Sequence, residues 1–150
     1  MEFVEMSVTS HNEEETKKTG YALAKILQAG DCVALFGDLG SGKTVFTKGI
    51  AEGIRVFQEV TSPTFTLMNE YEGENVILRH FDMYRIKGEE ALYDIGYFDS
   101  LRAPYLAVIE WSENIEEFLS PEAILVFFQK TDESSRELKI RMPKERGIKG

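Results

Sequence analysis

The sequence predicts an α/β fold with a mixed, partly parallel sheet, flanking helices and antiparallel hairpin additions. Two runs of strand length, 32–36 and 106–109, are wholly apolar, which is typical of strands that are buried on both faces of a sheet. Helical patterns alternate with strand patterns along the chain, and this alternation favours parallel pairing. The 150 residues contain no internal repeat and no linker rich in proline or serine, so we expect a single domain over 1–150.

The first part of the chain predicts a strand, a helix, a buried strand and a second helix. Residues 3–8 alternate between polar and apolar side chains, as in a strand. Ser10 and Glu13 have the spacing of a capping box, so a helix should begin there and end near Gly30. The apolar run 32–36 is followed by a glycine-rich turn and then by an amphipathic helical stretch.

The rest of the chain predicts two hairpins, two short helices and the second buried strand. In chain order we expect strands 64–71 and 75–84 around a turn, a helix within 89–98, strand 106–109, a helix within 112–119, and strands 123–130 and 136–142 around another turn. Arg79 and His80 interrupt the apolar pattern of the strand that ends at Asp82. That interruption is more typical of an edge or hairpin strand than of a buried parallel one.

Residues 37–44 form the most informative motif. They are Gly37, Asp38, Leu39, Gly40, Ser41, Gly42, Lys43 and Thr44, and they match the phosphate-binding pattern G-x-x-x-x-G-K-[ST]. Glycine lets the backbone curl until successive N–H groups point at an anion, helped by the N-terminus of the following helix. Lys43 can reach the β- and γ-phosphates of a nucleotide, and the Thr44 hydroxyl can bind Mg²⁺.

The surroundings of this loop are those of a nucleotide site. An apolar strand precedes the loop and an amphipathic helix follows it, so we predict a P-loop NTPase-like fold that binds nucleotide phosphates. The patterns N-K-x-D and D-x-x-G of the common GTPases are both absent from the sequence. Their absence favours ATP over GTP.

Two acidic residues are candidates to complete the site. Mg²⁺ and a hydrolytic water usually need a carboxylate at the end of a neighbouring parallel strand. Glu110 ends the uninterrupted apolar run and is the preferred candidate, whereas Asp82 ends the interrupted strand. A surface acid is the alternative for each. Arg85 follows Asp82 by three residues and could neutralise it or contact a phosphate, and we favour neutralisation.

A third feature is the stiff turn around Pro63. Proline biases the preceding residue away from helix, so the hydroxyl groups of Ser62 and Thr64 should project from the turn. Its position after the phosphate loop resembles a switch segment that senses a γ-phosphate, although a plain loop that enters a strand is equally compatible. Trp111 beside Glu110 could cover the site or contact a partner, but packing is the default for a single tryptophan.

Charge is distributed unevenly along the chain. Seventeen basic and twenty-six acidic residues give a net charge of −9, which should repel nucleic-acid phosphates at long range. Residues 136–150 carry six bases and two acids, or +4, so residues 1–135 carry −13. The basic C-terminal strand and tail could contact a partner or an RNA, although a solvated strand and tail is the simpler interpretation.

Cysteine, histidine and hydropathy patterns exclude several classes of protein. The single Cys32 excludes an intramolecular disulfide framework and is expected in the core. The two histidines are isolated and cannot by themselves build a zinc site. No apolar run approaches the roughly 20 residues that span a membrane, and the acidic N-terminus is unlike a signal peptide. We therefore expect a cytoplasmic protein that does not bind membranes.

Taken together, the motifs resemble the TsaE (YjeE) family of bacterial P-loop ATPases over nearly the whole domain. The resemblance rests on GDLGSGKT at 37–44, SPTFTL at 62–67, HFDMYR at 80–85 and IEW at 109–111, and the acidic segment 88–99 is similar too. It implies a protein that is required for threonylcarbamoylation of adenosine 37 in tRNAs that read ANN codons.

The resemblance also implies roles for individual residues. Loop 37–44 would hold the phosphates of ATP or ADP, and Thr44 would bind Mg²⁺. Asp82 would be the Walker-B-like acid and Glu110 would bind or organise the metal and the water, with Trp111 beside it. The resemblance further makes Thr64 the switch threonine, and places the adenine near residues 9–12.

The implied partners are the proteins TsaD and TsaB, with tRNA reached only indirectly through their complex. In that family the ATPase does not itself modify tRNA, and it is expected to be weak without its partners. Two other functions remain possible from the residues alone. A small-molecule kinase would need an acceptor domain and a basic lid, neither of which is evident in the sequence. A nucleotide-binding scaffold without hydrolysis is compatible with every motif.

Overall fold

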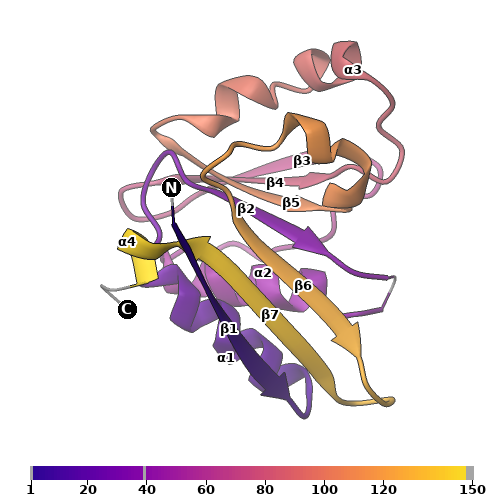
Figure 1. The fold of residues 1–150 in the computed structure, drawn as a ribbon. Helices are drawn as coiled ribbons and strands as arrows, with labels where there is room; N and C mark the ends of the chain where they lie inside the picture. Colours follow the sequence, from indigo (N-terminus) through magenta and orange to yellow (C-terminus); the bar gives the residue numbers. More distant parts are fainter. Residues whose placement is uncertain (1, 39, 148–150) are drawn as a thin grey trace.

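The computed structural model describes residues 2–38 and 40–147. Within them, seven strands form one sheet in the order β1-β7-β6-β2-β5-β4-β3 (Figure 1). The strands are β1 (Phe3–Ser10), β2 (Cys32–Phe36), β3 (Met68–Glu72), β4 (Ile77–Asp82), β5 (Tyr105–Glu110), β6 (Ile124–Lys130) and β7 (Arg136–Pro143). The α-helices are α1 (Glu13–Ala24), α2 (Lys43–Gly53), α3 (Glu89–Asp94) and α4 (Lys144–Gly147), and the 3₁₀ helices are η1 (Phe98–Leu101) and η2 (Ser112–Phe118).

The sheet is parallel in its centre and antiparallel at both sides, which confirms the predicted mixed α/β fold. Strand β2 pairs in parallel with β5 and β6, and β5 pairs in parallel with β4. Antiparallel pairs extend both sides, because β3 joins β4, and β7 joins β6 and β1. The two predicted hairpins therefore form, and the N-terminal strand lies along the outer side of the C-terminal one (Figure 1).

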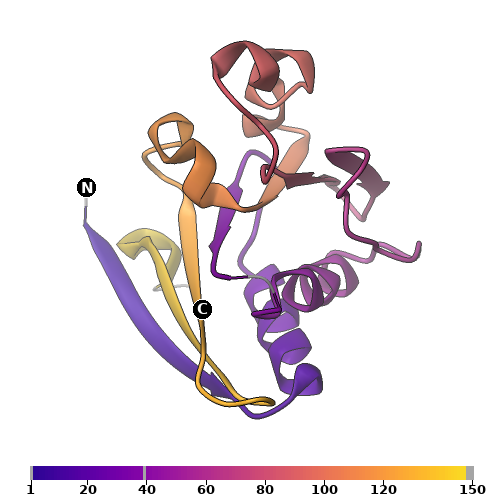
Figure 2. The same cartoon turned by 90° about the vertical axis from the view of Figure 1, so that its right-hand side faces the viewer.

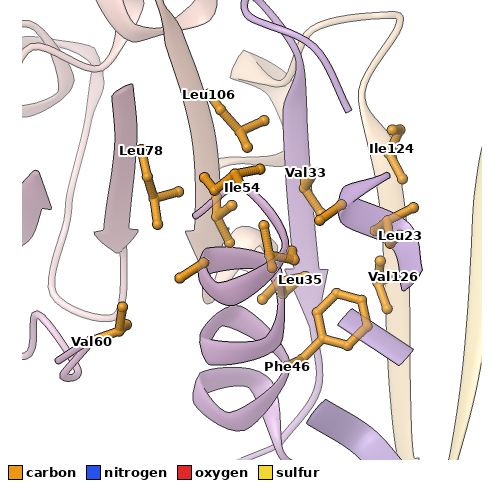
Figure 3. Packing of buried hydrophobic residues seen from close by; sticks show 14 of the residues in the cluster. Leu23, Val33, Leu35, Phe46, Ile54, Val60, Leu78, Leu106, Ile124 and Val126 are labelled. Atoms are coloured by element: carbon orange, nitrogen blue, oxygen red, sulfur yellow. The ribbon is translucent and has the colours of Figure 1, made fainter. Parts of the chain in front are cut away.

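Helices cover both faces of the sheet. Helices α1 and α2 lie side by side on one face, whereas α3 lies apart from them (Figure 2). Alternate side chains of β2 point to opposite faces, so Val33 and Leu35 join the cluster under α1 and α2, and Cys32 joins the cluster under α3, η1 and η2. Figure 3 shows the first cluster, with Leu23, Phe46 and Ile54 from the helical segments against Val33, Leu35, Leu78, Leu106, Ile124 and Val126. All five residues of β2 are buried, as its apolar run predicts.

Glycines let α1 and α2 approach each other closely. A Cβ atom added to Gly20 would lie 2.2 Å from the backbone oxygen of Phe46, and one added to Gly49 would lie 2.0 Å from that of Lys17. Such distances are far below van der Waals contact, so only glycine fits at these two positions. Because Gly49 belongs to the helix that begins at Lys43, this contact also fixes where that helix starts relative to the sheet.

The predicted capping box at the start of the first helix is wrong. The N-cap is Asn12, whose side chain accepts a hydrogen bond of 2.8 Å from the Glu15 N–H, and the Glu15 carboxylate accepts one from the His11 N–H. Ser10 is buried at the end of β1 and its hydroxyl lies 2.6 Å from that of Thr16. The capping motif is thus shifted by two residues, because Ser10 remains paired in the sheet.

Strand boundaries differ from the prediction around residue 64. Residues 64–67 form a turn in which the Leu67 N–H donates to the Pro63 oxygen, and Leu67 has a left-handed backbone with φ 68°. The strand therefore begins at Met68 rather than at Thr64. Strand β4 does belong to a hairpin, but it is not at the edge, because β3 and β5 flank it on its two sides.

The basic C-terminal segment is part of the fold as far as the structure describes it. Leu138, Ile140 and Met142 of β7 are buried, so a wholly solvated strand is wrong. In α4, the Arg146 guanidinium donates to the Ile26 backbone oxygen and to the Asp31 carboxylate. The last three residues of the predicted tail, 148–150, lie outside the described residues. None of the helices in the described part is both long and apolar enough to cross a membrane.

The contact between α1 and α2 predicts a large effect of one methyl group. Gly20→Ala should lower the free energy of unfolding by roughly 1–3 kcal/mol, because overpacking outweighs the better helix propensity of alanine. Urea denaturation measures this change. Lys18→Ala, at an exposed position of the same helix, is the control and should stay within about 0.5 kcal/mol of wild type. Equal stability of the two variants would contradict the close contact.

The buried thiol of Cys32 should be unreactive in the folded protein. Burial raises its pKa to about 12, so at pH 8 only about one thiol in 10,000 is ionised, and only the thiolate attacks a disulfide reagent. Colorimetric titration with an aromatic disulfide should detect no thiol under native conditions and one thiol in denaturant. A fast native reaction would show that β2 is open to solvent.

Candidate functional site

One edge of the parallel sheet holds the predicted motifs together. Glu110 is the last residue of β5 and lies opposite Asp82, the last residue of β4, while the loop that follows β2 runs along the same edge. A cavity of about 1100 Å³ opens there. Its lining includes Asn12, Glu13, Glu14, Thr16, Gly40, Ser41, Gly42, Lys43, Thr44, Val45, Ser62, Thr64, Phe65, Asp82, Tyr84, Arg85, Glu110, Trp111, Glu133, Ser134 and Arg136.

The alternation of side chains along the strands decides which face the acids occupy. The side chain of Glu110 points to the same face of the sheet as those of Leu106 and Val108, which pack under α1 and α2. The side chain of Asp82 likewise points to the same face as that of Leu78, which belongs to the same cluster. Both carboxylates therefore lie on the face where α2 begins, and they are only 5 % and 6 % exposed. Neither residue is a surface acid.

The phosphate-loop residues have the backbone that the motif needs. Gly40 and Gly42 have positive φ angles of 78° and 105°, which side chains with a Cβ rarely adopt. Gly42 is the N-cap of α2, so Lys43 and Thr44 form the first turn of that helix. Leu39, another predicted loop residue, lies outside the described residues.

The Lys43 ammonium group lies across the loop. Its Nζ donates to the backbone oxygen of Gly37 and lies 3.6 Å from the centre of the Trp111 ring. Burial lowers the pKa of Lys43, while the nearby carboxylates of Glu113 and Glu110 act in the opposite direction. A phosphate group would offer this partly desolvated cation a better partner than a neutral carbonyl.

Thr44, Glu110 and His80 form a chain of polar contacts. The Thr44 hydroxyl donates to the Glu110 carboxylate at 2.9 and 3.2 Å, and one oxygen of that carboxylate lies 2.6 Å from Nε2 of His80. His80 is fully buried and its Nδ1 has no partner in the described part of the chain. Since Glu110 is held from two sides, its carboxylate has a defined orientation toward the loop.

The oxygen groups at this edge suit Mg²⁺. The described residues contain no group of three or more His, Cys, Asp or Glu side chains that could hold a metal ion by themselves. Mg²⁺ does not need such a cage, because it keeps several waters and is usually bound through one or two carboxylates and phosphate oxygens. Thr44, Glu110 and Asp82 supply a hydroxyl and two carboxylates around one cavity, so the donor set fits.

Arg85 lies elsewhere than expected. Its guanidinium donates to the Thr64 backbone oxygen and lies 5.7 Å from the Phe65 ring, so the preferred neutralisation of Asp82 is wrong. The Asp82 carboxylate instead accepts a hydrogen bond of 2.9 Å from the Tyr84 N–H. Arg85 therefore ties the segment after Pro63 to the site while its charge remains beside the cavity.

The segment around Pro63 presents hydroxyl groups at the cavity. The Ser62 and Thr64 hydroxyls lie 2.9 Å apart and line the cavity, whereas Pro63 is buried. Phe65 is 87 % exposed. Trp111 also lines the cavity, with its ring between Lys43 and an edge-on Tyr84. Trp111 therefore packs against another aromatic ring and also lines the cavity.

Three contacts of the site were not expected from the sequence. The Glu113 carboxylate accepts a hydrogen bond of 2.8 Å from the Gly37 N–H, and Arg136 donates to loop oxygens from the far end of the chain. In the sequence, His80 stands out only as an interruption of an apolar strand pattern. Its place two residues before Asp82 was a usable signal, since residues i and i+2 of a strand share a face. Nothing in the pattern around Arg136 distinguishes it from the other bases of its strand.

Comparisons with known proteins identify the family. The family model described as threonylcarbamoyl adenosine biosynthesis protein TsaE matches residues 10–138. The chain is 42 % identical to the TsaE protein of Rickettsia felis over 130 residues, which cover 84 % of this chain and 74 % of the relative. It is 33 % identical to that of Treponema pallidum over 135 residues, or 90 % and 99 % of the two chains.

A solved structure is similar as well. The crystal structure of YdiB from Bacillus subtilis superposes with a TM-score of 0.80 at 32 % identity, and the match covers 97 % of this chain and 90 % of that one. The resemblance that the sequence motifs indicate is therefore confirmed. This chain belongs to the TsaE family of tRNA threonylcarbamoyladenosine biosynthesis proteins.

Proposed function

We propose that this protein is a P-loop ATPase that supports threonylcarbamoylation of adenosine 37 in tRNAs that read ANN codons. In this proposal it acts as a nucleotide-dependent partner of the TsaD–TsaB complex and reaches tRNA only through that complex. One observation carries the nucleotide part of the proposal: the hydroxyl of Thr44 and the buried carboxylate of Glu110 meet at the first turn of the helix that follows a phosphate-binding loop.

In this proposal, different side chains around the loop bind the phosphates and the Mg²⁺ ion. The N–H groups at the start of α2 and the Lys43 ammonium would hold the phosphates of ATP or ADP. Thr44, Glu110 and Asp82 would hold Mg²⁺, which when bound would draw negative charge away from the phosphate oxygens. His80 would keep the Glu110 carboxylate turned toward the loop. Trp111 would cover the phosphate side and limit its contact with water.

Hydrolysis would need a positioned water beside the terminal phosphate. A buried carboxylate at a strand end can orient such a water, and Glu110 and Asp82 are both available at this edge. The site is also close to a mostly exposed segment, 61–66, in which the hydroxyl groups of Ser62 and Thr64 line the cavity. We therefore assign to this segment a switch role, in which bound nucleotide and Mg²⁺ order Thr64 and complete a face for the partner proteins.

The overall charge fits an indirect role at tRNA. A net charge of −9 opposes direct binding to an RNA backbone, so contact through partner proteins is the simpler route. A cytoplasmic location, where tRNA is modified, belongs to the same proposal.

Two variants separate nucleotide binding from turnover. Lys43→Ala should weaken ATP binding by at least about 30-fold, or ~2 kcal/mol, because it removes the cation from the loop. Glu110→Gln should leave ATP binding nearly unchanged and slow phosphate release by roughly 10–100-fold, because the metal and the water lose their carboxylate. Calorimetric titration and a phosphate-release assay with Mg²⁺, with and without TsaD–TsaB, measure these effects.

Two other charged residues serve as matched controls. Lys48→Ala in α2 and Glu117→Gln in η2 remove the same charges outside the cavity and should behave as wild type. If Lys43→Ala bound ATP normally, the nucleotide site would be wrongly assigned. Binding without phosphate release in any combination would favour the non-hydrolysing scaffold, and transfer of the phosphate to a small molecule would favour a kinase.

The switch role predicts nucleotide-dependent partner binding. Immobilised TsaD–TsaB should retain the wild-type protein several-fold better with Mg²⁺ and a non-hydrolysable ATP analogue than with no nucleotide. Thr64→Ala should lose that difference. Thr66→Ala is the control, because its hydroxyl bonds Asn69 and does not line the cavity. Retention that ignores both nucleotide and Thr64→Ala would refute the switch.

A further inference from the structure

We propose that Arg136 is a positioning residue that holds the backbone of Gly40 and Ser41, in the phosphate-binding loop, in the form that binds phosphate. It thereby makes the turn between β6 and β7, residues 131–135, a part of the nucleotide site. This inference rests on the proposed function, since it assigns a purpose to a contact with the phosphate loop. Arg136 is the first residue of β7 and lies 92 positions after Thr44 in the sequence.

The guanidinium of Arg136 contacts two successive carbonyl groups of the loop. Its Nε donates to the Ser41 oxygen at 3.1 Å, and its Nη2 donates to the Gly40 oxygen at 2.9 Å. In a trans peptide the N–H group lies on the opposite side from the carbonyl. Fixing the Ser41 oxygen therefore fixes the N–H of Gly42, the residue that opens α2, and directs it away from the arginine.

The other side of the same guanidinium contacts the β6–β7 turn. Its Nη1 donates to the backbone oxygens of Asp132, Glu133 and Ser135 at 3.3, 3.3 and 3.0 Å. That turn is ordered by itself, because the Asp132 carboxylate accepts hydrogen bonds from the N–H groups of Ser134 and Ser135 at 2.9 and 2.8 Å. Arg136 thus links the loop to a turn that already has a defined conformation.

Arg136 lies on a strand, β7, that is held between two other strands. Its backbone is paired on both sides, with Lys130 of β6 and Ser10 of β1. A planar guanidinium on such a strand can bridge two groups of acceptors at fixed angles, whereas a lysine ammonium is a single point donor. The loop, by contrast, contains glycines with positive φ and has many accessible conformations when nothing holds it.

The positive charge of Arg136 also offsets negative charge around the cavity. The described cavity lining contains five acids, Glu13, Glu14, Asp82, Glu110 and Glu133, and three basic side chains, Lys43, Arg85 and Arg136. An anionic phosphate needs those cations to offset the surrounding carboxylates. Since the guanidinium donates to backbone oxygens of the loop and the turn in all five of these hydrogen bonds, Arg136 acts on the ligand chiefly through the loop that it holds.

The test compares the nucleotide-free and the nucleotide-bound protein. Arg136→Met removes the guanidinium, and Arg136→Lys keeps the charge but not the bridge. Arg141→Met is the matched control, because Arg141 lies on the same strand, stacks on Phe3 and does not line the cavity. Amide hydrogen exchange of the peptide that contains residues 37–44 reports on the loop without ligand. Quenching of the single tryptophan, Trp111, reports on ADP binding.

If Arg136 positions the loop, its variants should change both loop exchange and ADP affinity. In the absence of nucleotide, exchange in the loop peptide should be at least tenfold faster in Arg136→Met, with unchanged exchange in β2 and β5. ADP should bind at least tenfold more weakly to Arg136→Met, severalfold more weakly to Arg136→Lys, and normally to Arg141→Met. If Arg136→Met is globally destabilised, Arg136→Lys alone must show the faster loop exchange.

Other results overturn the proposal. Wild-type exchange in the loop together with weaker ADP binding would mean that Arg136 contacts the nucleotide directly. Wild-type values of both would mean that the bridge has no role in binding. If the wild-type protein itself does not bind ADP, the proposed function fails, and the exchange measurement still decides whether Arg136 holds the loop.

Discussion

The burial of β2 between two parallel neighbours is the constraint on which the site depends. All five residues of this strand are buried, so it must be covered by other strands at its sides and by helices on both faces. Parallel pairing with β5 brings the carboxyl ends of both strands to the same edge. Because α2 must also pack under the sheet through its glycine contact with α1, its first turn is placed beside Glu110.

A chain of buried polar groups is the local consequence of that placement. A carboxylate that is almost fully buried loses hydration, and hydrogen bonds from Thr44 and a contact with His80 offset part of this cost. His80 itself is buried, and its Nδ1 has no hydrogen-bond partner within the described residues. Polar groups without a partner are common at functional sites, where they lower the stability of the fold but serve the function.

The site combines rigid and exposed parts. The strands and Arg136 belong to the hydrogen-bonded sheet, and Arg136 holds Gly40 and Ser41 of the loop, whereas Phe65 in the segment 61–66 is exposed. A site with this division can keep its phosphate-binding geometry constant while the exposed segment responds to the ligand. A hydrogen bond from Arg85, just after β4, reaches Thr64 in that exposed segment, and the bonds from Arg136 of β7 reach the loop.

The sequence by itself determined the mixed α/β fold, the buried strands, the phosphate loop and the family. These features are local: an apolar run of strand length and a glycine-lysine-threonine loop depend on residues that are adjacent in the chain. Tertiary structure decided that β4 lies inside the sheet, that Asn12 rather than Ser10 caps the first helix, and that Arg85 contacts Thr64 rather than Asp82. It also decided the contacts of His80 and Arg136, because hydrogen bonds between residues 30 or 95 positions apart depend on strand order and register, which side-chain patterns along one segment do not contain.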